Sequence, residues 1–441
     1  MSFEINRRKA ALEIFLASVE SVKPDNLINR FMQLNKNILQ IDETTFDLSV
    51  IKNIYVVGAG KASAIMARAV ESVLGSRITS GQIVTKYGHG VPLRFIGLTE
   101  AGHPVPDENG LNGTARIMSI VDRAGEGDLV ICLISGGGSA LLTDVPEGCT
   151  LEEMKALNDI LLKCGANINE INCIRKHVSR VKGGQLSKAA YPARVVSLIL
   201  SDVIGDPFDV IASGPTAADP STYSEAISIV NKYKIENELP DRILQILYEG
   251  FENKQAETLK ETDRVFLNTI NKIIGNNRLA LQTARVKAEE LGYETQILTD
   301  KISGDVSEVA SFILSTIRST KLEKPGRKLC LLMGGEPTLK VTGSGRGGRN
   351  QHLALVIANL LKGQQGTTIL SCGTDGTDGP TDAAGAVVDS FTSLNASKLN
   401  LDIEEYIRNF DSYNFFKQEG GLIITGPTQT NVMDLMVILV E

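Results

Sequence analysis

Five glycine-rich segments follow predicted strands and carry side chains that could bind a phosphate or a carboxylate. They are Gly58-Ala59-Gly60-Lys61, Ser135-Gly136-Gly137-Gly138-Ser139, SDVIGDP at 201–207, GGEP at 334–337 and GTDGTDG at 373–379. Ligands bind beyond the carboxyl ends of the strands in parallel sheets, and glycine allows a ligand to approach the backbone closely. Because the segments are spread over both halves of the chain, they predict a large polar ligand held between two domains.

The first two segments have the chemistry of an anion site. Lys61 begins a predicted helix, where free amides and the helix dipole favour negative charge. The segment at 135–139 offers consecutive amides as an anion nest, although a tight strand-to-helix turn would use the same residues. The candidate phosphate-binding residues are Gly58, Gly60, Ser135, Gly136, Gly137, Gly138 and Ser139.

Two arginines and three aspartates complete the candidate set. Arg346 and Arg349, in GSGRGGRN ahead of a helix at about 350–361, offer bidentate donors to phosphate or carboxylate, or are simple surface charges. Asp375 and Asp378 suit Mg²⁺, which takes one or two carboxylates plus substrate phosphates; capping of turns is the alternative. Asp202 directly follows an apolar strand and is the better active-site candidate in SDVIGDP.

Two other segments favour structural roles. His103 stands beside Pro104 and Pro106, which indicates a rigid turn. The basic residues of 175–182 predict a solvated helical face, with a position turned to the cleft as the alternative.

The segment VGAGKAS does not complete a dinucleotide fingerprint. Ser63 stands at the third glycine position, and the next strand ends in Thr85-Lys86 where a ribose-binding acid is required. The sequence also has no GxxxxGK[ST] motif, which excludes a P-loop. These absences argue against hydride transfer and leave phosphate binding as the better interpretation.

Composition removes several classes of protein. The 441 residues carry 45 Lys and Arg against 52 Asp and Glu, a net charge of −7, so a nucleic-acid partner is not expected. The apolar runs are strand-sized, so neither a membrane span nor a signal peptide is predicted. Six cysteines without paired spacing indicate free thiols in a reducing cytoplasm, and four scattered histidines make a zinc site improbable.

The elements that must position these residues alternate between short apolar runs and helical patterns. Strands are predicted at 52–57, 81–86, 94–99, 128–134 and 195–201, and a second series opens near Val265. The alternation in the first series predicts βαβ units on a mostly parallel sheet, and the second series is also predicted to be α/β. Roughly 100–200 residues per domain imply at least two domains, and the polar stretch near 255–262 places the boundary between 1–258 and 259–441.

Eight motifs occur in order between residues 56 and 386: VVGAGKAS, AGHPVPD, ISGGGSALL, RKHVSRVKGGQL, LSDVIGDP with IASGPT, MGGEP, GSGRGGRNQ and GTDGTDGPTDAAGA. As a set they resemble the class II glycerate 2-kinases of the MOFRL family, whose members are often labelled hydroxypyruvate reductases. The resemblance covers nearly the whole chain. It implies a large N-terminal Rossmann-like αβα sandwich, a smaller C-terminal α/β MOFRL domain and an active cleft between them.

The resemblance also implies phosphorylation of D-glycerate at its 2-hydroxyl, dependent on ATP and on Mg²⁺ or another divalent cation. It assigns catalytic roles to Lys61 and Arg349, to which we add Asp202. The family usually reads GGRNQE, whereas His352 replaces the acid here; this matters for substrate or metal only if the position faces the cleft. An NAD(P)H-dependent hydroxypyruvate reductase and a kinase of a related 2-hydroxy acid remain alternatives, and a homodimer is left open.

Overall fold

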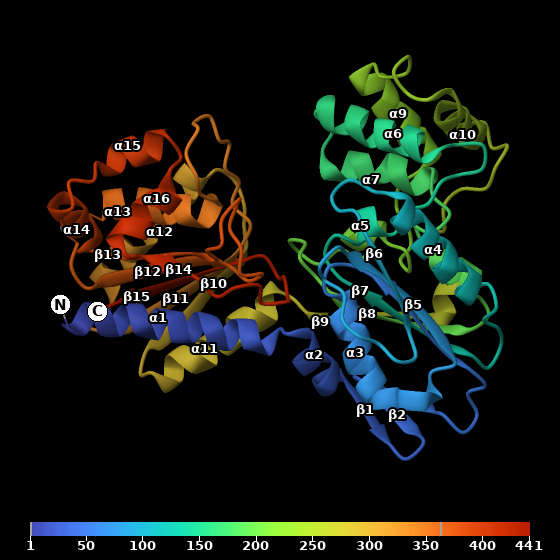
Figure 1. Cartoon of the computed structure of the whole chain (residues 1–441), viewed down its shortest axis with the longest axis horizontal. Coiled ribbons are helices and arrows are strands. Elements are labelled where there is room, and N and C mark those ends of the chain that lie inside the picture. The colour runs from blue at the N-terminus through green and yellow to red at the C-terminus, as the bar shows by residue number, and fades with distance from the viewer. Residues whose placement is uncertain (1, 362–363) are drawn as a thin grey trace. The chain divides into compact units, whose positions relative to one another are not determined.

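The computed structural model describes residues 2–361 and 364–441, which form two compact units (Figure 1). The N-terminal unit comprises residues 27–274. The C-terminal unit combines residues 275–441 with the first 26 residues of the chain. The chain therefore passes from one unit to the other between residues 26 and 27 and again between 274 and 275. The sequence predicts a single boundary, between residues 258 and 259.

The N-terminal unit is built on a six-stranded sheet. In order across the sheet, its strands are β6 (Gly97–Ala101), β5 (Ser80–Lys86), β4 (Ile54–Ala59), β7 (Leu129–Ile134), β8 (Arg194–Leu200) and β9 (Thr269–Gly275). The pairs from β6 to β8 are parallel. Counted along the chain, this order is 3-2-1-4-5-6, that of dinucleotide-binding sheets. The expected Rossmann-like αβα architecture is confirmed.

Helices of this unit cover the sheet and form a second apolar cluster of their own. Those near the sheet are α3 (Ser63–Leu74), α4 (Glu108–Val121), α5 (Gly138–Leu141) and α8 (Gln185–Ala190). A separate helical cluster contains α6 (Leu151–Lys163), α7 (Ile168–His177), α9 (Tyr223–Tyr233) and α10 (Asp241–Phe251). The strands β4 and β7 are buried throughout, as expected for a sheet covered on both faces.

A small antiparallel sheet was not expected from the sequence. It contains β1 (Met32–Asn35), β2 (Ile38–Ile41) and β3 (Thr44–Asp47). The preceding helix, α2 (Pro24–Phe31), ends directly before β1. The strands alternate buried and exposed side chains, and such short alternating runs are easily taken for the end of a helix.

The sheet of the C-terminal unit is mixed. Its strands, in order, are β10 (Glu294–Ile302), β11 (Leu329–Gly335), β15 (Asp434–Val440), β12 (Thr367–Gly373), β13 (Gly385–Asp389) and β14 (Leu422–Ile423). Of its strand pairs, β10 with β11 is parallel and the other four are antiparallel. The predicted α/β architecture is confirmed for this unit too, and its sheet is mixed because the last strand inserts between β11 and β12 in the opposite direction.

Helices lie on both faces of this sheet (Figure 1). One face carries α12 (Val306–Glu323), α13 (Arg349–Leu360), α14 (Thr392–Lys398), α15 (Ile403–Arg408) and α16 (Ser412–Glu419), and the other carries α1 (Ser2–Ser21) and α11 (Asn277–Glu290). In α1, Arg7 forms an ion pair with Glu441 at 2.8 Å and Arg8 one with Asp389 at 2.6 Å. These pairs, with buried Phe15, attach the start of the chain to its end.

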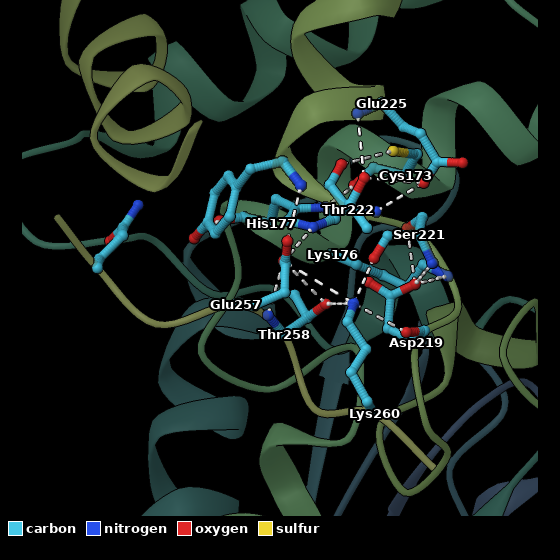
Figure 2. Close-up of polar contacts among 12 residues, drawn as sticks. Cys173, Lys176, His177, Asp219, Ser221, Thr222, Glu225, Glu257, Thr258 and Lys260 are labelled. Carbon is cyan, nitrogen blue, oxygen red and sulfur yellow. Dashed lines mark hydrogen bonds and ion pairs between the residues drawn. The ribbon is translucent and has the colours of Figure 1, made fainter. Parts of the chain in front are cut away.

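The polar stretch expected to be a linker is part of the N-terminal unit (Figure 2). The Lys260 ammonium donates to the carbonyl oxygens of Asp219, at 3.0 Å, and Ser221. The Glu257 carboxylate lies 2.8 Å from Nε2 of His177 and accepts from the amide of Tyr223 at 3.0 Å. With these bonds in place, the chain leaves this unit only after β9 completes its sheet.

The basic face expected over 175–182 is largely buried. Lys176 is 3% exposed and lies 2.7 Å from Asp219 (Figure 2). Lys182 is also buried, and its ammonium donates to the carbonyl of Leu142 at 2.6 Å and contacts Asp144 at 3.3 Å. These lysines pair within the fold because the separate helical cluster packs over them, and the prediction of a solvated face is wrong.

Within residues 2–361 and 364–441, no helix combines the length and the apolar character needed to cross a membrane.

Candidate active site

Two glycine-rich loops meet at the centre of the N-terminal sheet. One follows β4 and the other follows β7, and these neighbouring strands connect onward to opposite sides of the sheet. Such a switch point leaves a crevice at the strand ends, where ligands bind. The loops are joined by hydrogen bonds from the Lys61 amide to the Gly136 carbonyl, at 2.9 Å, and from the Ala62 amide to Ser135 Oγ, at 3.0 Å.

Three polar side chains converge on Gly136 and Gly137. A Cβ on Gly136 would collide with the Asp202 carboxylate. A Cβ on Gly137 would lie 2.8 Å from Nε2 of His103 and 3.3 Å from Cε of Lys61. These three side chains come from the segments after β8, β6 and β4 respectively. The close approach explains why both loop positions are glycine.

The imidazole of His103 is neutral in the physiological range. Burial, and next the positive charge of Lys61, lower the pKa of His103 to about 4. Lys86 and His89 act in the same direction. His89 also contacts the carbonyl of Lys61 through Nδ1, at 3.1 Å. The sequence analysis assigns His103 to a structural turn and therefore does not include it in the site.

The other predicted glycines and serines of these loops have packing partners. A Cβ on Gly58 would collide with the backbone of Leu133 in β7. A Cβ on Gly60 would collide with Ser135, which directly follows β7. The Ser139 hydroxyl lies 3.0 Å from that of Ser213. These contacts hold the two loops and the adjoining 211–213 turn together, and they give a structural reason for the residue types found there.

In the C-terminal unit, the antiparallel insertion of β15 creates an acidic centre. Asp434, the first residue of β15, pairs in register with Gly335 on one side and Gly373 on the other. Glu336 and Asp375, each shortly after one of these glycines, are therefore brought to the same edge of the sheet. Asp434 is buried and was not identified from the sequence, because its position depends on the direction of β15.

Arg349 binds two of these acids. Its Nε and Nη2 contact the two oxygens of Asp434 at 2.6 and 3.0 Å, and Nη1 contacts Glu336 at 2.7 Å. Burial disfavours the charged guanidinium, but the bond to Asp434 and its charge raise the pKa of Arg349 above its ordinary value. A guanidinium has five N–H donors, so two remain for a ligand.

The ionised form of Glu336 is disfavoured at this position. Burial raises its pKa above the ordinary value, and the charge of Asp434 adds to that effect although Arg349 opposes it. Its side chain is nevertheless 45% exposed. Glu336 is therefore the partner of Arg349 that an incoming anion could most easily replace.

Asp378 caps the start of α13. Its oxygens accept from the amides of Asn350 at 3.1 Å and Gln351 at 2.8 Å. Burial raises the pKa of Asp378 to about 6, although these bonds favour the charged form. Asp375 is half-buried, and its Oδ1 accepts from the Thr377 amide at 3.0 Å.

The acids fit a divalent cation only in part. Among residues 2–361 and 364–441, no three His, Cys, Asp or Glu side chains are arranged to hold a metal by themselves. Mg²⁺ needs only one or two carboxylates when phosphates and water complete its shell. Asp375 suits that role better than Asp378, whose two oxygens already accept hydrogen bonds from α13.

Arg346 and His352 have partners within the C-terminal unit. The Arg346 guanidinium lies over the Tyr413 ring at 4.5 Å, and its Nε donates to the Pro380 carbonyl at 3.1 Å. His352 is buried on α13 and stacks on Phe410, with ring centroids 4.8 Å apart. The residue that departs from the family pattern is thus packed inside the unit.

The structure brings the predicted residues together in two groups. Lys61, Asp202 and the loop at 135–139 gather in the N-terminal unit, and Arg349, Asp375 and Asp378 gather in the C-terminal unit. His103, Glu336 and Asp434 join these groups although the sequence analysis did not select them. The MGGEP and AGHPVPD motifs were visible signals for Glu336 and His103, whereas Asp434 lies in no such motif.

Comparisons with known proteins agree over almost the entire chain. Residues 10–248 match the family described as a domain of unknown function, DUF4147, and residues 329–434 match the MOFRL family. The chain is 42% identical to the D-glycerate 2-kinase of Thermotoga maritima over 436 residues, which cover 98% of each protein. It is 37% identical to the glycerate 2-kinase of Pyrococcus horikoshii, covering 98% of this chain and 97% of that one.

Two further comparisons bear on fold and function. The crystal structure of glycerate kinase from Thermotoga maritima superposes with a TM-score of 0.88 at 40% identity, over 99% of this chain and all of that one. A relative from Agrobacterium vitis, 40% identical over 390 residues, is named a putative hydroxypyruvate reductase; 87% of this chain and 86% of that one are covered.

Proposed function

The chain belongs to the glycerate kinase family that combines DUF4147 and MOFRL domains, and from this premise we propose that it is a D-glycerate 2-kinase. The reaction transfers a phosphate from ATP to the 2-hydroxyl of D-glycerate and yields 2-phosphoglycerate. The observation that carries the proposal is the convergence of Lys61 and Asp202 on the Gly136–Gly137 loop, at the switch point of the sheet.

Phosphoryl transfer requires charge neutralisation and alignment of the reacting groups more than covalent chemistry. We assign the loop at 135–139 to phosphate binding, with Gly58 and Gly60 shaping the loop beside it. Lys61 contributes a positive charge beside this loop, since its stem lies against Gly137. Arg346 is assigned to the nucleotide because it is exposed, with its guanidinium over the Tyr413 ring and its Nε bonded to the Pro380 carbonyl.

Asp202 is assigned to the attacking hydroxyl. Its carboxylate lies against Gly136, so it can accept a hydrogen bond from a hydroxyl placed beside the phosphate loop. Arg349 is assigned to the glycerate carboxylate or the transferred phosphate, using donors that Asp434 leaves open. Exchange of Glu336 for a substrate anion would keep the guanidinium paired throughout.

Mg²⁺ or another divalent cation is assigned to Asp375, with Asp378 beside it. When bound, the cation neutralises phosphate charge. The hard oxygen donors of the two carboxylates suit such an ion.

The hydroxypyruvate reductase alternative is favoured by the name of the relative from Agrobacterium vitis. The residues at the positions of the dinucleotide fingerprint argue against a reductase. Ser63 Oγ donates to the Gly60 carbonyl at 2.7 Å, and Thr85 Oγ1 donates to the same carbonyl at 3.0 Å. The positions of a third glycine and a ribose-binding acid are thus occupied by residues that brace the loop.

Product analysis separates these functions. Purified protein is incubated with ATP, Mg²⁺ and D-glycerate and followed by phosphorus NMR. We expect 2-phosphoglycerate, and no oxidation of NADH or NADPH with hydroxypyruvate. Nicotinamide oxidation without ATP turnover would overturn the proposal, and a panel of 2-hydroxy acids in place of D-glycerate tests the related-substrate alternative.

A further inference from the structure

We propose that His103 is a ligand-binding residue, whose imidazole and the Lys61 ammonium together bind the anionic group held at Gly136–Gly137. The inference rests on the proposed function for the presence of an anion at this loop. His103 follows β6, two strands away from β4, yet a Cβ on Gly137 would meet both its Nε2, at 2.8 Å, and Lys61 Cε, at 3.3 Å. The imidazole edge and the lysine stem therefore face the same glycine.

The surroundings of His103 are predominantly cationic. Lys61 faces it from the loop after β4, and Lys86 and His89 face it from the end of β5 and the segment that follows. Asp202 lies against the neighbouring glycine of the loop, on the side of β8. A purely structural turn residue would not require two lysines and a second histidine around it, whereas an anion would be stabilised by all of them.

Binding of an anion changes the charge of this residue. Without a ligand, burial and Lys61 hold His103 neutral, with a pKa of about 4. A carboxylate or phosphate placed between the imidazole and Lys61 adds an opposite charge within contact distance and raises the pKa. The site then takes up a proton when the ligand binds, and its affinity increases as the pH falls.

Two anions of the proposed reaction share this chemistry: the glycerate carboxylate and the phosphate groups of ATP. Histidine side-chain NMR titrations of the full chain, free, with D-glycerate alone and with ATP alone, distinguish them. The chain contains four histidines, and the spectrum of His103→Gln assigns the His103 signal. We expect one of the two ligands to raise the His103 pKa by at least about one unit, since a neighbouring opposite charge commonly shifts a pKa by that amount.

His177 serves as an internal control because its imidazole is already bonded to Cys173 and Glu257. Its NMR signals should not respond to either ligand. A rise at His103 with D-glycerate assigns the carboxylate, and a rise with ATP assigns the phosphate. No change with either ligand, or no binding of either ligand, overturns the inference.

A binding measurement supplies the second test. The D-glycerate carboxylate does not titrate between pH 5 and 7, so calorimetry in this range reports on the protein. If glycerate is the anion, wild-type affinity should rise about twofold or more as the pH falls across this range, and the slope should be smaller in His103→Gln. If ATP is the anion, the same difference in slope should appear with ATP. Equal slopes in the two proteins would contradict the inference even if both phosphorylate glycerate, and absence of turnover would count against the proposed function alone.

Discussion

The side chain of Lys61 lies against Gly137, so its ammonium is placed to contact a phosphate held by the Gly136–Gly137 loop. A charge that contacts the transferring phosphate stabilises the transition state more than the ground state, so its loss should lower kcat. Lys61 is partly exposed and forms no buried ion pair among the described residues. Removal of its side chain should therefore change the stability of the fold little. The residue is thus suited to a test that separates chemistry from stability.

We expect Lys61→Ala to lower kcat about 10²–10³-fold, equivalent to roughly 3–4 kcal/mol, without lowering the melting temperature. Lys61→Met keeps much of the stem and should be equally inactive if the charge is responsible. Steady-state kinetics with ATP and D-glycerate and thermal denaturation measure both effects. Near-normal kcat in both variants would place the phosphate site elsewhere, and a raised KM for ATP alone would make Lys61 a ground-state contact.

Asp375 and Asp378 form a matched pair for the metal. They are three residues apart in the chain. Of the two, Asp378 accepts hydrogen bonds from two α13 amides. Asp375→Asn removes a charge that a hard cation needs, so activity should require about tenfold or more additional Mg²⁺ while the melting temperature stays unchanged. Asp378→Asn should instead lower the melting temperature, because Asn has a single acceptor oxygen whereas both oxygens of Asp378 accept from α13 amides.

Magnesium titrations of activity and thermal denaturation of both variants check this division. A wild-type magnesium titration in Asp375→Asn would reduce that residue to the capping of its turn. A large shift in the titration of Asp378→Asn, without a change in stability, would make Asp378 the main ligand.

At the scale of the element, the loop after β7 depends on backbone that only glycine supplies without cost. Gly137 has a φ of +82°, and any Cβ there would also press on His103 and Lys61. Gly292, after α11, has nearly the same φ, +84°. A Cβ added there would meet no neighbouring atom within 4 Å. Substitution to alanine should cost about 1 kcal/mol of stability at either position from the left-handed backbone alone.

We expect Gly137→Ala to lower kcat/KM about 10²-fold or more, because displacement of reacting groups by an ångström costs rate on this scale. Gly292→Ala should lose comparable stability and keep its activity. Kinetics and chemical denaturation of both variants provide the comparison. Equal activities would show that the loop tolerates a side chain and that the contact with His103 and Lys61 has no catalytic consequence.

At the scale of the whole molecule, the contacts define two units that do not follow chain order. The fragment 27–274 contains all of β4 to β8 and nearly all of β9, and it keeps the bonds of Glu257 and Lys260. The fragment 1–258 lacks β9 and Lys260, and it exposes the apolar face of α1, including Phe15. The first should therefore unfold cooperatively at a higher temperature than the second.

Calorimetry and analytical ultracentrifugation of the two fragments test this division. We expect a monomeric, cooperative transition for 27–274 and aggregation or a broad, lower transition for 1–258, because exposed core surface promotes association. Equal stability of the two fragments would favour the boundary at 258/259.

Local patterns were sufficient for much of this protein. Alternation of apolar runs and helical stretches predicted the strands β4, β5, β7 and β8. In β4 and β7, burial on both faces demands nearly continuous apolar residues. The glycine loops were placed at strand ends because each glycine segment directly follows a predicted strand in the sequence. Since parallel strands end at one edge of a sheet, the proximity of Lys61, Asp202 and the loop at 135–139 follows from the sequence once the sheet is parallel.

Only the tertiary structure decided the remaining features. The direction of β15 places Asp434 between Gly335 and Gly373, and the pairing of α1 with the far end of the chain joins residues separated by more than 350 positions. His103 reaches Gly137 because β6 and β7 lie on the two sides of β4. Each depends on which distant segments bury one another, and that choice is made by the free energy of the whole packed unit rather than by the local pattern of any one segment.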